Sequence, residues 1–151
     1  SVAIDYDRQG APATRQRALD AVRTGWTACL DSDDEWLPEH VEKLLLHAEQ
    51  EQADYVYSWF YGTNGFDPFP KHFGRPFDPL SPVETTSTIL VRTELAMAAR
   101  YERVPERLFN TGEDWRFLNR CIELGAKIVH LPERTWRWNI HESNTSGLPN
   151  W

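Results

Sequence analysis

Between Ser1 and Tyr61, segments with strand character alternate with segments that have the spacing of a helix. In order along the chain, the segments are residues 1–5, 13–23, 26–30, 38–50 and 54–61. Alternation of strand and helix is typical of right-handed crossover units, which place parallel strands side by side. The sequence therefore predicts an α/β fold, with a Rossmann-like, mostly parallel sheet flanked by helices, in a single domain over residues 1–151.

A long connection follows the last of these strands. Residues 62–82 are rich in Gly, Pro and Phe, and loops of this length in compact domains usually carry function. Beyond it, strands are expected at 85–92, 126–131 and 134–140, and helices at 93–100 and 110–125. The last helix has apolar residues at every third or fourth position, so one of its faces should pack against the sheet.

Charge and hydropathy argue against two classes, general nucleic-acid-binding proteins and proteins with a membrane-spanning helix. The formal net charge is -7, whereas a general nucleic-acid-binding protein needs a basic surface. No apolar run approaches the roughly 20 residues that a membrane helix needs. Cys29 and Cys121 lie in apolar patterns and are expected to be reduced, which together with the absence of a signal-peptide pattern favours a cytoplasmic protein.

Three carboxylates are crowded into the segment that follows residues 26–30: Asp31, Asp33 and Asp34. In open α/β sheets, ligands bind beyond the carboxyl ends of the strands, where these side chains are expected. A hard divalent cation would offset their mutual repulsion, and it would let an acidic protein hold a diphosphate. The alternative is that they cap the helix at 38–50, a role that needs only one carboxylate.

Two stretches together resemble family-2 glycosyltransferases with the A-type fold. They are "GAPATRQRALDAVRTGWTACLDSDDEWLPEHVEKLL" and "TGEDWRFLNRCIELGAKIVHLPERTWRWNIHESNTSG". Members of that family typically show a segment like "GxxxARNxAL", then a strand that ends in "LDxDD" and a helix opened by proline. The resemblance implies inverting transfer of a sugar from a nucleotide-diphosphate sugar to a hydroxyl acceptor, with Mn²⁺ or Mg²⁺ as cofactor.

The resemblance also assigns roles on the donor side of the site. Asp33 is the first choice for direct coordination of the metal, and Asp34 is an alternative. Asp31 would face the ribose or the donor sugar, or share the metal. His141 would complete the metal site or contact the diphosphate, and Ser143–Ser146 would donate hydrogen bonds to phosphate.

The N-terminal part departs from the family pattern, because the usual first strand and helix are missing. The segment "VAIDYD" stands in the place of the second strand, which makes Asp5 and Asp7 candidates for binding the base or the ribose. Arg15 matches the arginine of the "ARN" segment, with Gln16 in place of the asparagine. It would contact the donor or hold the aspartate loop, or else it is an exposed helix residue. A partner subunit or a second copy of the chain would complete a pocket of this truncated or minimal form.

The segment "GEDW" carries the expected catalytic residue. By resemblance, Asp114 is the general base that takes the proton of the acceptor hydroxyl, and Glu113 and Trp115 lie on the acceptor side. An inverting transfer needs one such carboxylate and no protein nucleophile. The alternative is structural, because acidic residues favour the first turn of a helix and Thr111 would begin a capping box.

Two other functions stay open at this point. A non-catalytic nucleotide- or sugar-binding module of the same fold would bind its ligand without turnover. A metal-dependent phosphohydrolase would cut a diphosphate without any acceptor, although the chain matches no hydrolase motif.

Overall fold

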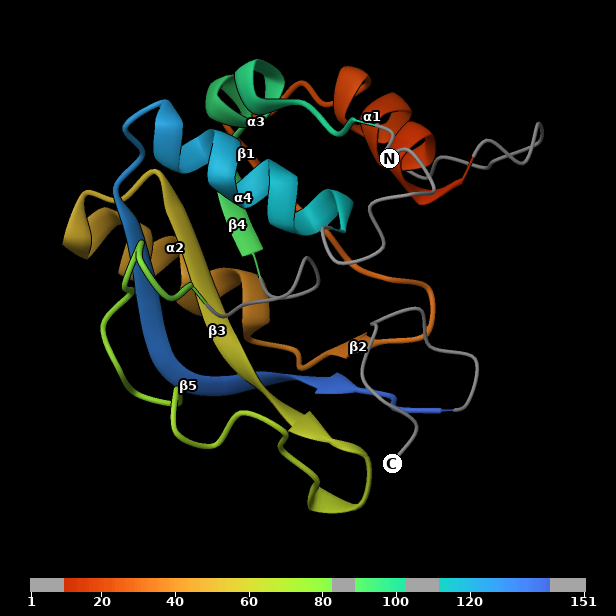
Figure 1. Ribbon diagram of the computed structural model, residues 1–151, viewed down its shortest axis with the longest axis vertical. Coiled ribbons are helices and arrows are strands. Elements are labelled where there is room, and N and C mark those ends of the chain that lie inside the picture. Colours follow the sequence, from red (N-terminus) through yellow and green to blue (C-terminus); the bar gives the residue numbers. More distant parts are fainter. Residues whose placement is uncertain (1–9, 83–88, 103–111, 142–151) are drawn as a thin grey trace.

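A computed structural model shows a five-stranded sheet with helices on both of its faces (Figure 1). The structure describes residues 10–82, 89–102 and 112–141. The strands are β1 (Trp26–Ala28), β2 (Glu35–Trp36), β3 (Tyr55–Gly62), β4 (Ile89–Arg92) and β5 (Ile128–Trp138). The helices are α1 (Ala11–Asp20), α2 (His40–Glu51), α3 (Thr93–Ala99) and α4 (Glu113–Glu123), with a 3-10 turn, η1, at Thr63–Gly65. Within the described ranges, no helix is both long enough and apolar enough to cross a bilayer.

The sheet has the order β1-β4-β3-β5-β2 and is mixed. β3 and β5 pair in parallel, and the other three pairs are antiparallel. β1, β3 and β5 still run in one direction, because β4 lies between β1 and β3 and opposes both. The α/β fold is thus confirmed, but the sheet is mixed rather than mostly parallel. The reason lies in the connection from β3 to β4, because its described part, residues 63–82, has no α-helix that would carry the chain back across the sheet.

Different helices cover the two faces of the sheet, because side chains alternate along each strand. On one face, α1, α3 and α4 pack over Tyr57 and Val91. On the other face, α2 packs Leu44 over Val56 and Leu90. β3 is buried on both faces of the sheet, which requires apolar residues at nearly every position. This apolar run is what makes β3 recognisable as a strand in the sequence.

One prediction for the end of the chain is wrong in its detail. The two strands expected at 126–131 and 134–140 form one continuous strand, β5. Pro132 and Glu133 are exposed and lie at a register shift in the pairing with β3, between the positions of His130 and Arg134. Proline is tolerated at such a bulge, where its missing N–H does not break the ladder.

His40, at the start of α2, is a buried titratable group that the sequence does not point out. Its Nδ1 lies 2.7 Å from the hydroxyl of Thr135, and that hydroxyl lies 2.6 Å from the hydroxyl of Ser58. The ring of Trp36 stacks on the imidazole, with 4.8 Å between the centroids. Burial lowers the pKa of His40 from 6.5 to about 4, and the bond to Thr135 offsets only part of this effect.

We therefore expect the free energy of unfolding to decrease as the pH falls from about 6.5 towards 4. The unfolded chain then takes up a proton that folded His40 does not accept, at a cost of roughly 2 to 3 kcal/mol. Urea unfolding at about pH 7 and about pH 4.5 measures this loss in the wild type and in His40→Asn. Asparagine can bond to Thr135 without titrating in this range, so the variant should lose less stability on acidification. His47→Asn, on the same helix but only half-buried, is the matched control. An equal loss in wild type and His40→Asn would contradict the prediction.

Candidate functional site

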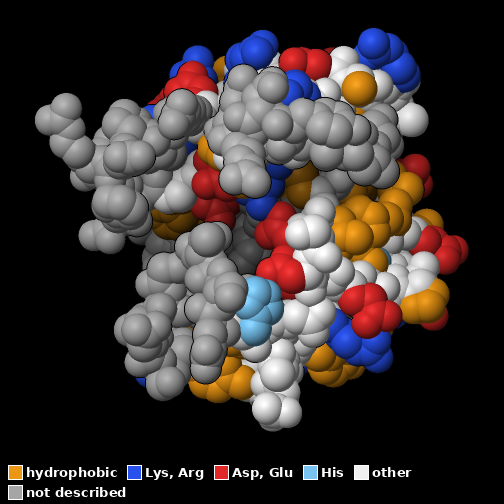
Figure 2. Space-filling model, turned by 90° about the vertical axis from the view of Figure 1, so that its right-hand side faces the viewer, with side chains coloured by type: hydrophobic (Ala, Val, Ile, Leu, Met, Phe, Trp, Pro, Cys, Tyr) orange, Lys and Arg blue, Asp and Glu red, His pale blue; other side chains and the backbone are white. Residues whose placement is uncertain are grey.

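The loop between β1 and β2 carries the three aspartates, directly beyond the C-terminal end of β1. Figure 2 shows acidic side chains gathered around a hollow in this face of the molecule, with a histidine at its edge. The alternative in which these aspartates cap the following helix is wrong. β2 lies between the loop and α2, and the N-cap residue of α2 is Glu39, without a side-chain cap.

Arg15 of α1 joins the aspartate loop to the start of α4. Its Nη2 donates to Oδ1 of Asp31, and its Nη1 donates to Oε1 of Glu113. The arginine side chain is only 18% exposed. Burial lowers the pKa of Arg15, but the two carboxylates outweigh it, so the pKa lies above its usual range and the guanidinium stays charged. Of the possibilities that the sequence leaves open for Arg15, the structure shows contact with the aspartate loop.

A second set of contacts ties the aspartate loop to the end of β5. Nε2 of His141 lies 3.0 Å from Oδ2 of Asp33. The backbone N–H of Asn139 donates to Oδ1 of Asp34 at 3.0 Å, and its side-chain amide donates to the carbonyl of Asp33. The carboxylate of Asp33 and the imidazole of His141 are 39% and 45% exposed, so both are partly accessible to solvent.

The chemistry of this pair fits a divalent transition-metal ion. A carboxylate oxygen suits both Mn²⁺ and Mg²⁺. An imidazole nitrogen binds transition metals such as Mn²⁺, whereas Mg²⁺ is held almost entirely by oxygen ligands. Asp33 and His141 therefore match Mn²⁺ better than Mg²⁺. Asp31, also expected as a metal ligand, faces Arg15 instead, and the described residues nowhere gather three His, Cys, Asp or Glu side chains around a common point.

Asp114 lies in the first turn of α4, next to the residue that Arg15 holds. Its Oδ1 accepts a hydrogen bond from the backbone N–H of Trp115 at 2.7 Å. Burial raises the pKa of Asp114 and the charge of Glu113 adds to this effect, while the bond from Trp115 opposes it. A carboxylate with a raised pKa is a stronger base than an ordinary aspartate. Trp115 itself is 38% exposed.

Gly112 precedes this turn and contacts the carboxylate of Asp114. A Cβ placed on Gly112 would lie 2.4 Å from Oδ1 of Asp114, which is far closer than any normal contact. The glycine therefore makes room for the carboxylate at the start of the helix. Gly112 and Asn139, which contact Asp114 and the aspartate loop, were not predicted from the sequence. The available signals were a glycine directly before the acidic pair and an amide two residues before His141.

Several expected site residues lie outside the described part of the chain. They are Asp5 and Asp7, Thr111, and Ser143–Ser146. Their predicted contacts with the donor, the helix start and the phosphate remain predictions.

Comparison with known proteins gives matches in sequence and in structure. The family model described as glycosyl transferase family 2 matches residues 5–107. The uncharacterized glycosyltransferase MJ1057 of Methanocaldococcus jannaschii is 25% identical over 146 residues, which cover 87% of this chain and 47% of that protein. This chain therefore spans about half the length of that curated relative.

Solved structures of S. aureus TarS, residues 1–349, show a similar fold. The complex with UDP-GlcNAc superposes with a TM-score of 0.72 at 20% identity, covering 90% of this chain and 40% of that one. The complex with UDP gives a TM-score of 0.67 at 19% identity, with 85% and 40% covered. The expectation of an A-type glycosyltransferase fold is confirmed by this similarity.

Proposed function

Because the chain belongs to glycosyl transferase family 2, we propose that it carries the donor site and the catalytic base of a sugar-transferring enzyme. The proposed reaction moves a sugar from a nucleotide-diphosphate sugar to a hydroxyl acceptor. The observation that carries the proposal is the contact of Arg15 with both Asp31 and Glu113. It brings the aspartate loop and the helix start that bears Asp114 to one place, although they are far apart in the sequence. The UDP and UDP-GlcNAc complexes of TarS support a UDP-linked sugar as the donor.

Asp114 is the proposed general base. It would take the proton of the acceptor hydroxyl while the oxygen attacks the anomeric carbon of the donor sugar. The bond from that carbon to the diphosphate oxygen breaks, and the nucleoside diphosphate leaves with the bonding electrons. A single displacement of this kind inverts the anomeric configuration and needs no protein nucleophile. The raised pKa of Asp114 favours this proton transfer.

The proposed donor site combines residues from both sets of contacts. Asp31, oriented by Arg15, would accept hydrogen bonds from ribose or sugar hydroxyls. Asp33 and His141 would hold Mn²⁺, which when bound supplies positive charge to the leaving diphosphate. Such compensation matters here because the chain has a net charge of -7.

Binding of UDP should depend on manganese if Asp33 and His141 are ligands. We expect calorimetry to give at least about tenfold tighter binding of UDP with Mn²⁺ than with a chelator, a difference of about 1.4 kcal/mol. Asp33→Asn and His141→Ala should remove most of this difference. His47→Ala, which changes a half-buried histidine on α2, should retain it. Equal affinity with and without the metal would contradict the metal site.

A second measurement separates the proposed transferase from its alternatives. Release of UDP from UDP-GlcNAc should require an alcohol acceptor and should accompany formation of a glycoside. Binding without any release across a broad set of donors and acceptors would instead identify a non-catalytic binding module. Cleavage of the diphosphate that does not depend on an acceptor would identify a phosphohydrolase.

A further inference from the structure

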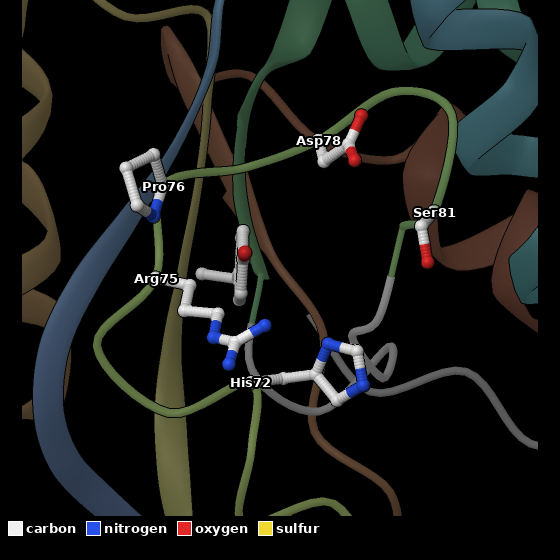
Figure 3. A pocket seen from close by; sticks show the side chains of 6 residues that line it. His72, Arg75, Pro76, Asp78 and Ser81 are labelled. Carbon is white, nitrogen blue, oxygen red and sulfur yellow. The ribbon is translucent and has the colours of Figure 1, made fainter.

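A small cavity lies beneath the connection from β3 to β4. Its volume is about 100 Å³, and it is lined by Tyr57, His72, Arg75, Pro76, Asp78 and Ser81 (Figure 3). Tyr57 comes from β3, and the other lining residues come from the loop. In Figure 1 this yellow-green loop leaves the end of β3 and passes back across the sheet towards β4.

The loop that forms the cavity is fastened to the sheet. Asp67 accepts hydrogen bonds from the indole N–H of Trp59 at 2.8 Å and from the guanidinium of Arg134 at 2.9 Å. The backbone N–H of Gly74 donates to Nε2 of His130 at 3.1 Å. Burial lowers the pKa of His130, so its ring stays neutral and can accept this bond. The walls of the cavity are therefore held in place by β3 and β5.

The side chains that line the cavity are suited to an anion. The guanidinium of Arg75, the imidazole of His72 and the hydroxyl of Ser81 have no hydrogen-bond or ion-pair partner within the described residues. Figure 3 shows the side chains of Arg75 and His72 close to one another on one side of the cavity. Guanidinium and imidazole N–H groups donate to oxyanions, and arginine does so with two parallel bonds.

One acidic residue, Asp78, also lines the cavity. Oδ1 of Asp78 accepts the backbone N–H of Leu80 at 2.9 Å, so this carboxylate already takes part in a turn of the loop. Between Asp67 and Asp78 the chain has no other acidic residue, whereas it has Lys71, His72 and Arg75. On a chain with a net charge of -7, this segment is a local concentration of positive charge.

The register of the sheet places Tyr57 two strands away from β1, at the level where the aspartate loop begins. Tyr57 pairs with Ile89 of β4, and Ala28 pairs with Leu90, the next residue of the same strand. Tyr57 therefore lies level with Cys29, directly beyond the end of β1 and two residues before Asp31. Its side chain points to the face that α4 covers, and α4 begins with the turn that carries Asp114.

We propose that this cavity binds an oxyanion, a phosphate or carboxylate group, on the acceptor. The inference rests on the proposed function and adds an acceptor class to it, because the group would lie on the same face of the sheet as Asp114. A cavity of about 150 Å³ holds a benzene ring, so one of about 100 Å³ admits a charged group rather than a whole sugar ring. Arg75 and His72 would donate to the oxyanion, and the reacting hydroxyl would extend from it towards Asp114.

Direct binding of methyl phosphate tests the cavity itself. Calorimetry should show binding that Arg75→Gln and His72→Gln each weaken at least about tenfold. Lys71→Gln, a change in the same loop outside the cavity, should leave it unaltered. A chelator and Asp33→Asn should also leave it unaltered, since they act on the proposed donor site. No binding, or binding that Arg75→Gln does not change, would overturn the inference even if UDP binds normally.

Paired acceptors test whether the oxyanion belongs to the acceptor. With UDP-GlcNAc and Mn²⁺, we expect a KM for glycerol 3-phosphate at least about tenfold below that for glycerol. Arg75→Gln should abolish this difference by raising the KM for glycerol 3-phosphate, whereas Lys71→Gln, outside the cavity, should preserve it. Glycerate in place of the phosphate separates a carboxylate preference from a phosphate preference. If methyl phosphate binds but neither anionic acceptor has a lower KM than glycerol, the cavity is no acceptor site. If methyl phosphate binds and UDP does not, the oxyanion site stands while the proposed function fails.

Discussion

Asp114→Asn should lower the rate of sugar transfer by about a hundred- to ten-thousand-fold and leave the affinity for UDP nearly unchanged. The amide cannot take the proton of the acceptor hydroxyl, but its oxygen can still accept the bond from the N–H of Trp115. The measurement is UDP release from UDP-GlcNAc, with calorimetry for the affinity. Turnover close to that of the wild type would remove Asp114 from the role of base.

Stability serves as an internal control for this variant. Burial raises the pKa of Asp114, so its ionised form is less favourable in the folded chain than in the unfolded one. This penalty is absent at pH values below the ordinary pKa of aspartate. It grows as the pH rises from the ordinary pKa to the raised pKa of the folded chain, and it is fully present above that. A neutral asparagine avoids it, so the variant should be at least as stable as the wild type near neutral pH. Lost activity could then not be ascribed to unfolding.

Gly112→Ala offers an independent test of the same carboxylate. The added methyl group would lie 2.4 Å from Oδ1 of Asp114, so the carboxylate must move. We expect a lower kcat with unchanged affinity for UDP, because the base is displaced while the donor site is intact. Glu123→Gln, at the other end of α4, changes an exposed carboxylate and should match the wild type.

Arg15→Met should lower the free energy of unfolding by about 2 to 3 kcal/mol and weaken the binding of UDP. Without the guanidinium, Asp31 and Glu113 face one another as uncompensated, partly buried charges. Arg15→Lys should give an intermediate loss of stability, since a single ammonium cannot reproduce the geometry with which the guanidinium contacts both carboxylates. Urea unfolding and UDP calorimetry give both quantities.

Arg120→Met is the matched control for this prediction. Arg120 pairs with Glu123 on the surface of α4, where both side chains are more than half exposed. Exposed pairs of this kind contribute about 0.3 to 0.5 kcal/mol. If Arg15→Met costs no more than Arg120→Met, the contact of Arg15 does not hold the two segments together.

The sequence predicts best the elements whose apolar residues form a clear pattern, either a helical spacing or a continuous run. The apolar spacing of Val41, Leu44 and Ala48 identifies α2, and the apolar run of residues 54–61 identifies β3. β2 has only two residues, too few for any pattern. The direction of β4 follows from the path of residues 63–82, and local sequence carries no information about that path. The continuity of β5 could not be predicted, because a proline between two apolar segments looks like a turn in the sequence.

For the candidate site, the position of the aspartates in the fold was predictable and their hydrogen-bond partners were not. The aspartates follow β1 at the end of the sheet where α/β proteins bind ligands, as the sequence implies. The spacing of Asp31 and Asp33 does not reveal that one turns to Arg15 and the other to His141. Arg15 and Glu113 are 98 residues apart, and no local pattern links them. The role of Asp114 comes from the resemblance and awaits its test.

β5 has a consequence for the size of the molecules that the site would accept. This one strand bears His130, which holds the loop of the oxyanion cavity, and it ends at Trp138, three residues before His141. Its pairing with β3 extends from Tyr55 to Gly62, so the two ends cannot shift without breaking that pairing. The strand therefore fixes the distance between the proposed metal ligand, His141, and the oxyanion cavity. Acceptors would be sorted by the number of bonds between their charged group and their nucleophilic oxygen, and chains that are too short or too long would be rejected.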